Sequence, residues 1–394
     1  MRVFVETARS GSVSVAAERC HLSQPAASQA LARLEDDLGT PLLIRKRQHS
    51  GLTACGAIFE RRALKALAHL KEGALAALRE VGTVGRRGAT FETAVTASQL
   101  RNLIAIANSG SFTVAAQALG LSQPTVHRTA RSLEAVAGLS FFAARSSGVR
   151  LTPAAEAFVL GAKLAQTELR QGAEEISLEL GLEAGTFVLG SLPLARTSIV
   201  PKAVHAMVSE IEGFQIRVVE GRYAELLRSL REGDIDCIIG ALRYPIPADD
   251  VKQDVLFRDA LALVASPDHP LASKTNVRFE DTFAYPWIAP PKTTPAGQYL
   301  FETLRIQDLD QTPVRVVSSS MAILRGVLAQ GDYVSVVSKH QISVDETLGA
   351  ITALNVDLKG HMRDIGLTYR QDWQPTETQA EFIKKLRMFC QSAA

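Results

Sequence analysis

The chain has 394 residues, which is more than one domain usually holds and favours two or three domains. Charged residues make up 21% and apolar residues 46%, a composition typical of folded protein. The four cysteines fit no zinc or CxxC pattern, no apolar run approaches the roughly 20 residues of a membrane span, and the start does not have the pattern of a secretory signal. We therefore expect a reduced, cytoplasmic protein with no membrane partner, metal or cofactor.

The net formal charge of +2 is spread unevenly along the chain. Residues 1–90 carry +6, residues 91–184 carry −1 and residues 185–394 carry −3. Positive charge gathered at one end favours a polyanionic partner there, although an ordinary solvated surface explains the same count.

A duplication with a fixed offset of 99 residues is the most informative feature of the sequence. Residues 10–39 align with residues 109–138, and the register continues without a gap to Phe59 and Phe158. Of the 56 aligned positions that begin at Phe4, 17 are identical. This agreement is too large and too evenly placed for chance, so the chain is expected to contain two related units.

Each copy predicts three short helices. Aliphatic residues three and four apart indicate the first helix, over residues 4–9 and again over residues 100–108. Serines at N-cap positions begin the other two, with a proline in the first turn of the third helix and a glycine after it; these serines are Ser12, Ser23, Ser111 and Ser122. Such an order is typical of a helix-turn-helix, whose last helix can enter a major groove.

A two-stranded wing and a long helix follow each third helix. Basic or glycine-rich tips between apolar pairs predict the wings over residues 41–53 and 140–152. The long helices are predicted over residues 53–80 and 152–180, each about 40 Å in length. In the first of them an apolar stripe is expected to face a partner helix, formed by Leu64, Leu67, Ala68 and Leu70.

This arrangement resembles the DNA-binding half of LysR-type transcriptional regulators. The resemblance rests on Leu22-Ser23-Gln24-Pro25 through Leu34-Glu35 and Leu52-Thr53, and on Leu121-Ser122-Gln123-Pro124 through Leu133-Glu134 and Leu151-Thr152. Family members normally carry one such unit, so the second copy departs from the family pattern. We expect the two long helices to pair either within one chain, which would let one chain hold two half-sites about 34 Å apart, or between chains.

The resemblance and the polar residue types together give the candidate DNA contacts. Polar and cationic side chains reach base edges and phosphates, whereas the prolines and alanines act as scaffold or make methyl contacts. The candidates in the first copy are Ser23, Gln24, Pro25, Ala26, Ser28, Gln29, Arg33, Arg45 and Lys46; those in the second are Ser122, Gln123, Pro124, Thr125, His127, Arg128, Arg131, Arg145 and Arg150. The alternative is that one copy is only a packing module.

The composition changes near residues 181–185, after which strand-like runs alternate with helices. This alternation predicts a mostly parallel α/β fold. Eight strands are expected, over residues 186–190, 214–220, 237–240, 261–265, 287–289, 313–317, 334–337 and 366–370, which suit two lobes better than one sheet. The predicted architecture is thus a two-lobed α/β effector domain preceded by two all-α winged helix-turn-helix units with long linker helices. We expect domains at 1–90, 91–184 and 185–394, with lobe I at 185–265 and 340–394 and lobe II at 266–339.

The last domain resembles the effector-binding domain of the same family, which is similar to type II periplasmic binding proteins. The resemblance rests on Gly233-Asp234-Ile235-Asp236-Cys237 and on His269-Pro270-Leu271-Ala272. Ligands of open α/β sheets bind beyond the carboxyl ends of strands. That rule selects Ser191, Arg196, Thr197, Ser198, Arg243, Lys292, Thr293, Thr294, Ser318 and Ser319 as effector contacts. Hydroxyls and cations suit a small anionic or hydroxylated molecule, such as an organic acid or a sugar derivative, although a helix cap explains each residue singly.

Nothing in the sequence indicates catalysis. Asp234 and Asp236 lie between a glycine turn and a buried strand, where a cap and a strand-edge residue are expected, and there is no HExxH, GxSxG, P-loop or GxGxxG. We predict a DNA-binding transcription regulator, not an enzyme, that is a homo-oligomer and has double-stranded DNA, a small-molecule effector and RNA polymerase as candidate partners. The alternative is a small-molecule-binding protein whose repeats serve assembly.

Overall fold

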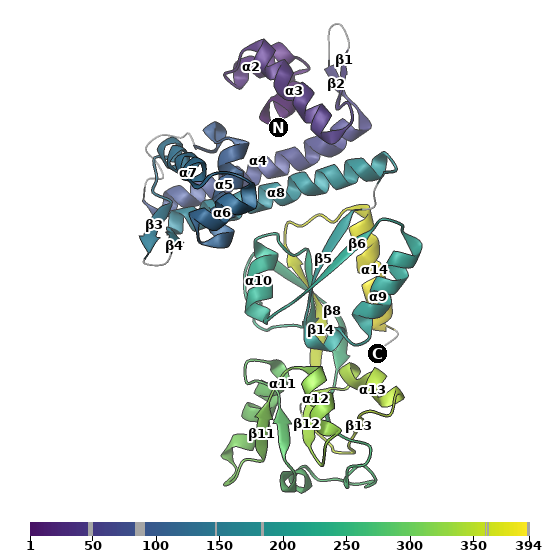
Figure 1. Cartoon of the computed structure of the whole chain (residues 1–394). Helices are drawn as coiled ribbons and strands as arrows, with labels where there is room; N and C mark the ends of the chain where they lie inside the picture. Colours follow the sequence, from purple (N-terminus) through teal and green to yellow (C-terminus); the bar gives the residue numbers. More distant parts are fainter. Residues whose placement is uncertain are drawn as a thin grey trace. The chain divides into compact units, whose positions relative to one another are not determined.

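The structure, a computed structural model, describes residues 1–45, 50–82, 91–145, 148–182, 185–358, 360 and 362–391. Its contacts divide the chain into two compact units, Met1–Gly185 with Glu232–Asp234 and Thr186–Arg231 with Ile235–Ala394 (Figure 1). In these described ranges, no helix is long and apolar enough to cross a membrane, and no three His, Cys, Asp or Glu residues are grouped as metal ligands.

The first unit contains two groups of elements in the same order. The first group is α1 (Arg2–Ser10), α2 (Val13–Arg19), α3 (Gln24–Leu38), the paired strands β1 (Leu43–Arg45) and β2 (Ser50–Leu52), and α4 (Ala54–Glu80). After the 3-10 helix η1 (Phe91–Ala94), the second group is α5 (Ala97–Ser109), α6 (Phe112–Leu119), α7 (Gln123–Ala137), β3 (Phe142–Arg145), β4 (Gly148–Leu151) and α8 (Pro153–Glu179). The predicted helices and wings are therefore present, with ends within three residues of those expected.

Side-chain caps fix where these helices begin. In each case a hydroxyl oxygen accepts the backbone N–H three residues later, as Ser12 does from Val15. The residues that cap in this way are Ser12, Ser23, Thr53, Ser111, Ser122 and Thr152. A lost cap of this kind costs about 1 kcal/mol, so the repeated serines and threonines directly stabilise both groups.

The long helices α4 and α8 pack antiparallel against each other. Gly73 of α4 meets Gly161 of α8, and the opposite end of the contact joins Arg62 with Gly172. The predicted leucine stripe was only partly right, because Leu64 is 43% exposed and Ala68 also faces solvent. The buried face of α4 is made largely of small residues, which allow the two backbones to approach closely; these are Ala63, Ala66, Gly73, Ala74 and Ala77.

The second unit contains two five-stranded sheets. The first has the order β6-β5-β7-β14-β8, with β5 (Thr186–Ser191), β6 (Gln215–Glu220), β7 (Cys237–Ala241), β8 (Val251–Asp259) and β14 (Arg363–Arg370). The second has the order β11-β10-β12-β9-β13, with β9 (Leu261–Ala265), β10 (Trp287–Ala289), β11 (Val314–Val317), β12 (Val334–Ser338) and β13 (Thr352–Ala353). Strands β9 and β13 thus extend the second sheet beyond the 266–339 range expected for lobe II.

The sheets are mixed, not mostly parallel as expected. In the first sheet β5 is parallel to β6 and β7, whereas β14 is antiparallel to β7 and β8. In the second sheet β10 is parallel to β11 and β12, whereas β9 is antiparallel to β12 and β13. Strand β8 was missed because it is an edge strand with a polar sequence and only one neighbour, so it lacks the continuous apolar run of a buried strand.

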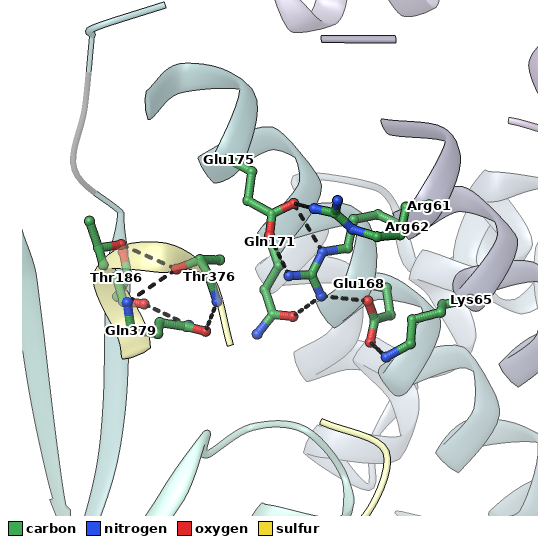
Figure 2. A network of polar contacts seen from close by, with 10 residues as sticks. Arg61, Arg62, Lys65, Glu168, Gln171, Glu175, Thr186, Thr376 and Gln379 are labelled. Atoms are coloured by element: carbon green, nitrogen blue, oxygen red, sulfur yellow. Dashed lines mark hydrogen bonds and ion pairs between the residues drawn. The ribbon is translucent and has the colours of Figure 1, made fainter. Parts of the chain in front are cut away.

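Helices cover both faces of the first sheet. The α9 helix (Ile199–Glu210) packs with α14 (Glu377–Gln391), and α10 (Tyr223–Arg231) lies on the other side of the sheet (Figure 1). Gln379 secures α14 because its side chain donates to the carbonyl of Thr186 at 3.1 Å and accepts from the N–H of Thr376 (Figure 2). The other helical segments are η2 (Pro193–Ala195), η3 (Phe279–Ala284), α11 (Pro295–Gln298), the π-helical η4 (Tyr299–Thr303), η5 (Ile306–Asp308), α12 (Met321–Leu328), η6 (His340–Ile342) and α13 (Ser343–Thr347).

Candidate nucleic-acid interface and effector site

The third helix of the first group presents a polar face to solvent. Ala27 and Leu31 are buried and hold α3 against its group. The exposed candidates on this helix are Gln24, Pro25, Ala26, Ser28, Gln29 and Arg33. The hydroxyl of Ser23 accepts the N–H of Ala26 at 3.4 Å, so this serine acts as a helix cap.

The matching helix of the second group is more cationic on its exposed face. Val126, Ala130 and Leu133 are buried, which turns the intervening residues outward. An open hollow of about 670 Å³ on this face is lined by Gln123, Pro124, His127, Arg128 and Arg131, all predicted DNA contacts. This surface offers amide, imidazole and guanidinium donors together, the groups that bind base edges and phosphates.

Several of these side chains also have local partners. The ring of His127 packs edge-on to that of Phe112, with centroids 5.2 Å apart. The Ser122 and Thr125 hydroxyls are 2.8 Å apart, and the Ser122 hydroxyl also caps α7. Arg131 donates to Glu134 at 2.5 Å, yet half of its side chain stays exposed. These contacts position the exposed face before any DNA is bound.

Two glutamates that the prediction treated only as family markers have a clear structural role. Glu35 accepts the backbone N–H groups of Leu42 and Leu43 at 2.8 and 3.2 Å. Glu134 makes the same pair of contacts to Phe141 and Phe142, at 2.7 and 3.1 Å. Glu35 therefore joins α3 to the start of the first wing, and Glu134 joins α7 to the start of the second. The sequence signal for this role was the presence of glutamate at the same position in both copies.

The wings contain the remaining DNA candidates. Arg150 lies on β4 with its side chain exposed. Arg45 ends β1 and Arg145 ends β3, but their side chains, like the whole of Lys46, lie outside the described residues. The structure thus leaves the Arg150 side chain accessible at the surface of the second wing.

A buried ion network joins the linker helices (Figure 2). Arg62 is 1% exposed and donates to Glu168 at 2.9 Å, to Gln171 at 2.9 Å and to both oxygens of Glu175 at 2.6 and 3.2 Å. Burial alone would lower the pKa of Arg62, but the hydrogen bonds to the two carboxylates outweigh it and the pKa is raised. The sequence analysis did not predict this network, because an arginine on an amphipathic helix such as α4 is usually exposed to solvent.

Most first-sheet effector candidates follow β5 and β7, but Ser191, expected beyond its strand, is the last residue of β5 and is paired within the sheet. Ser191 is fully buried, and its carbonyl accepts from Nε and Nη2 of Arg196 at 3.1 and 2.7 Å. Burial lowers the pKa of Arg196, partly opposed by Glu220, to which Arg196 donates at 2.9 Å. The guanidinium of Arg243 lies 4.6 Å from the centre of the Tyr223 ring.

The loop after η2 makes a further contact. The Thr197 hydroxyl donates to the carbonyl of Gln341 at 2.9 Å, which joins this loop to η6. Ser198 is buried and precedes α9 without a side-chain cap bond. At the other candidate arginine, Arg243, burial lowers the pKa. The nearby Tyr223 opposes this shift, and the positive charge of Arg363 adds to it.

The second-sheet candidates follow β10 and β11. Lys292 donates to Gln307 at 2.6 Å and lies over the ring of Phe301. Thr294 caps α11 by accepting the N–H of Gly297, and Ser318 accepts the N–H of Ser320 at 3.1 Å. Thr293 and Ser319 are exposed beside them. These residues do lie beyond strand ends, and one of them, Thr294, serves as a helix cap as well.

Comparison with known proteins matches this arrangement. The profile described as "Bacterial regulatory helix-turn-helix protein, lysR family" matches residues 1–57 and 97–156, and "LysR substrate binding domain" matches residues 180–391. The HTH-type transcriptional regulator GalR of Pseudomonas putida is 30% identical over 373 residues, which span 94% of this chain and 91% of GalR. The regulator PcaQ of Agrobacterium fabrum is 29% identical over 277 residues, spanning 70% of this chain and 89% of PcaQ.

Solved structures agree on the fold. A full-length OxyR variant from Pseudomonas aeruginosa has a TM-score of 0.53 at 23% identity. The match covers 75% of this chain and 97% of the OxyR chain. The structure of full-length CbnR complexed with its target DNA has a TM-score of 0.52 at 18% identity, covering 75% of this chain and 100% of its own. The helix-turn-helix and substrate-binding family models and the named relatives define a DNA-binding regulator with an α/β regulatory domain. The chain belongs to the LysR family and is a LysR-type DNA-binding transcriptional regulator with a substrate-binding domain.

Proposed function

We propose that both helix-turn-helix groups read double-stranded DNA and that a small effector bound in the α/β unit controls them. The observation that carries this proposal is the exposed cationic face of α7, where Gln123, His127, Arg128 and Arg131 line one hollow. Arginine recognises guanine and phosphate, and glutamine recognises adenine. The exposed Gln24, Ser28 and Gln29 of α3 give the first group a reading face of its own.

The proposed DNA contacts divide into two kinds. Side chains near the start of α3 and α7 read base edges, whereas Arg150 and the other wing cations hold phosphates and set the register. Ser23 and Ser122 contribute mainly by starting the reading helices, since their hydroxyls already accept backbone N–H groups. Phosphate contacts release counterions, so binding weakens steeply as salt rises.

The effector in this proposal is a small anionic or hydroxylated molecule, such as an organic acid or a sugar derivative. Arg196, Arg243 and Lys292 supply cationic donors, and the serines and threonines after the strands supply hydroxyls. The lowered pKa values of Arg196 and Arg243 reflect burial, which strengthens their attraction for an anion. Family members bind effectors and form oligomers, so we also propose a cytoplasmic homo-oligomer that contacts RNA polymerase.

The test is binding of the full chain to duplexes selected from a randomised pool, measured across a salt series. The R128A/R131A variant should bind at least about tenfold more weakly and lose base preference at one half-site, because a bidentate arginine–guanine contact is worth roughly 1–3 kcal/mol of discrimination. The matched control is R217A/R228A, which removes two exposed arginines from β6 and α10. A pool that yields no enriched sequence, even at low salt, would show that DNA reading is wrong and favour an assembly role.

A further inference from the structure

The contact between α4 and α8 is pseudo-symmetric in its backbone but not in its side chains. Under the 99-residue offset, Arg62 corresponds to Gly161 and Gly73 corresponds to Gly172. A two-fold rotation that exchanges α4 with α8 therefore places the Gly73–Gly161 contact on the Gly172–Arg62 contact. One of them brings two glycines together, and the other brings an arginine against a glycine.

The partners of Arg62 are present on α8 only. Under the same offset, Glu168 corresponds to His69, Gln171 to Glu72 and Glu175 to Ala76. Two α4 helices paired in this register would bury two arginines; each would meet a histidine and an alanine in place of Glu168 and Glu175, and one carboxylate, Glu72, in place of Gln171. Two α8 helices would bury the paired carboxylates with a glycine at the position of Arg62. A buried carboxylate without its cation is strongly destabilising, which disfavours the α8 pair. The α4 pair keeps one carboxylate for each arginine instead of two, so the α4–α8 pair satisfies the buried charges best.

The reading helices carried by this pair also differ. Over their full lengths α3 has a net formal charge of −2 and α7 has +1. His127, Arg128 and Arg131 of α7 correspond to Ser28, Gln29 and Ala32 of α3. Because arginine prefers guanine and glutamine prefers adenine, the two helices select different bases.

The spacing suits successive turns of one duplex. Each helix-turn-helix group is attached to the N-terminal end of its long helix, and the antiparallel packing puts these two ends at opposite ends of the pair. The 27-residue helices are about 40 Å long, close to the roughly 34 Å between major-groove half-sites one turn apart.

We propose that one chain acts as a built-in heterodimer of DNA readers and binds an asymmetric site of two unlike half-sites. This inference rests on the proposed reading of DNA by both groups. The half-site read by α7 is richer in guanine, whereas the half-site read by α3 is recognised mainly through neutral amide and hydroxyl groups. Two chains are not needed to cover the pair of half-sites.

The experiment selects sites with the full-length chain from a randomised duplex pool. The expected consensus holds two different blocks about one helical turn apart that are not inverted copies of each other. Titration of the chain with excess duplex that carries one pair of blocks should saturate at one duplex per chain, because each chain of a homo-oligomer holds its own pair of reading helices. R128A/R131A should relax one block, and Q24A/Q29A should relax only the other. An inverted-repeat consensus, two chains per duplex, or both variants acting on the same block would overturn the proposal.

A cross-linking measurement separates pairing within a chain from exchange between chains. Arg61 donates to Glu175 at 2.7 Å across the two helices, so R61C with E175C places two thiols near each other. A short bis-maleimide should link them within one chain, and an equal mixture of the two single variants should yield no covalent dimer above that of the parent chain. A covalent dimer from the mixture would overturn intrachain pairing. Failure of every variant and of the parent to bind DNA would instead refute the proposed function itself.

Discussion

Gly161 of α8 lies directly against the backbone of Gly73 in α4. A Cβ added to Gly161 would lie 2.4 Å from the carbonyl oxygen of His69 and 2.9 Å from Cα of Gly73. Both neighbours are backbone atoms, so the helices would have to separate to admit a methyl group. We expect G161A to destabilise the first unit by about 1–3 kcal/mol, although alanine favours an isolated helix. Urea unfolding followed by circular dichroism measures this loss.

Gly326 provides the control for that substitution. It lies on α12, is exposed, and a Cβ added there would have no neighbour within 4 Å. G326A should therefore stabilise its helix by up to about 1 kcal/mol through the lower conformational entropy of the unfolded chain. Equal responses of the two glycines to alanine would show that the close helix contact does not limit α4–α8 packing.

Arg62 and its neighbour Arg61 give a second matched pair. Both donate to Glu175, but Arg62 is 1% exposed and Arg61 is 53% exposed. R62A leaves Glu168 and Glu175 without their buried cation and should cost about 3–5 kcal/mol. R61A removes a solvent-exposed pair and should cost no more than about 1 kcal/mol. The free energies of unfolding of the two variants measure this difference. A smaller loss of stability for R62A than for R61A would contradict the greater importance of the buried arginine.

Much of the first unit could be predicted from its sequence because its signals are local. Caps such as Ser23 and Thr53 act within three residues, so the helix starts followed from residue type and spacing. The face of α4 that contacts α8 could not be predicted in the same way. Leucine spacing suggested Leu64, whereas close backbone packing selected small residues and buried Arg62, which depends on partners more than 100 residues away.

The effector candidates show the same limit. The rule for strand ends placed Arg243 and Lys292 in the loops that the structure gives them, whereas Ser191, expected just beyond its strand, is the last residue of β5. Their partners could not be predicted, because the Tyr223 ring beside Arg243 and the Gln307 amide beside Lys292 are tertiary contacts. Strand β8 was missed for a related reason: pairing with β14, not its own hydropathy, makes it a strand.

His269 predicts how the stability of the second unit changes with pH. Its Nδ1 accepts the N–H of Leu271 at 3.0 Å, and burial lowers its pKa below 6.5, partly opposed by Asp332. Since the folded pKa is the lower one, the unfolded chain binds the proton first as pH falls. The stabilisation is therefore complete above about pH 6.5 and is lost as the pH drops through the folded pKa.

The H269N variant tests this dependence. An asparagine oxygen can accept the same N–H without titrating, so the urea midpoint of H269N should change less than that of the parent between about pH 7 and 5. The half-buried His340, whose pKa burial also lowers, remains in both proteins and keeps part of the dependence. Substitution of the exposed His205 by asparagine is the control. An unchanged pH profile in H269N would refute the role of His269.

Arg150 on the second wing tests how the two groups of DNA contacts divide. Its exposed position on β4 is suited to a phosphate, so R150A should weaken binding to all duplexes by a similar factor. The slope of log affinity against log salt should fall by about 0.9, the value for one lost phosphate contact. The control R217A should leave both affinity and slope unchanged. A changed base preference with an unaltered slope would mean that Arg150 reads a base, and the separation between reading helices and wings would then be wrong.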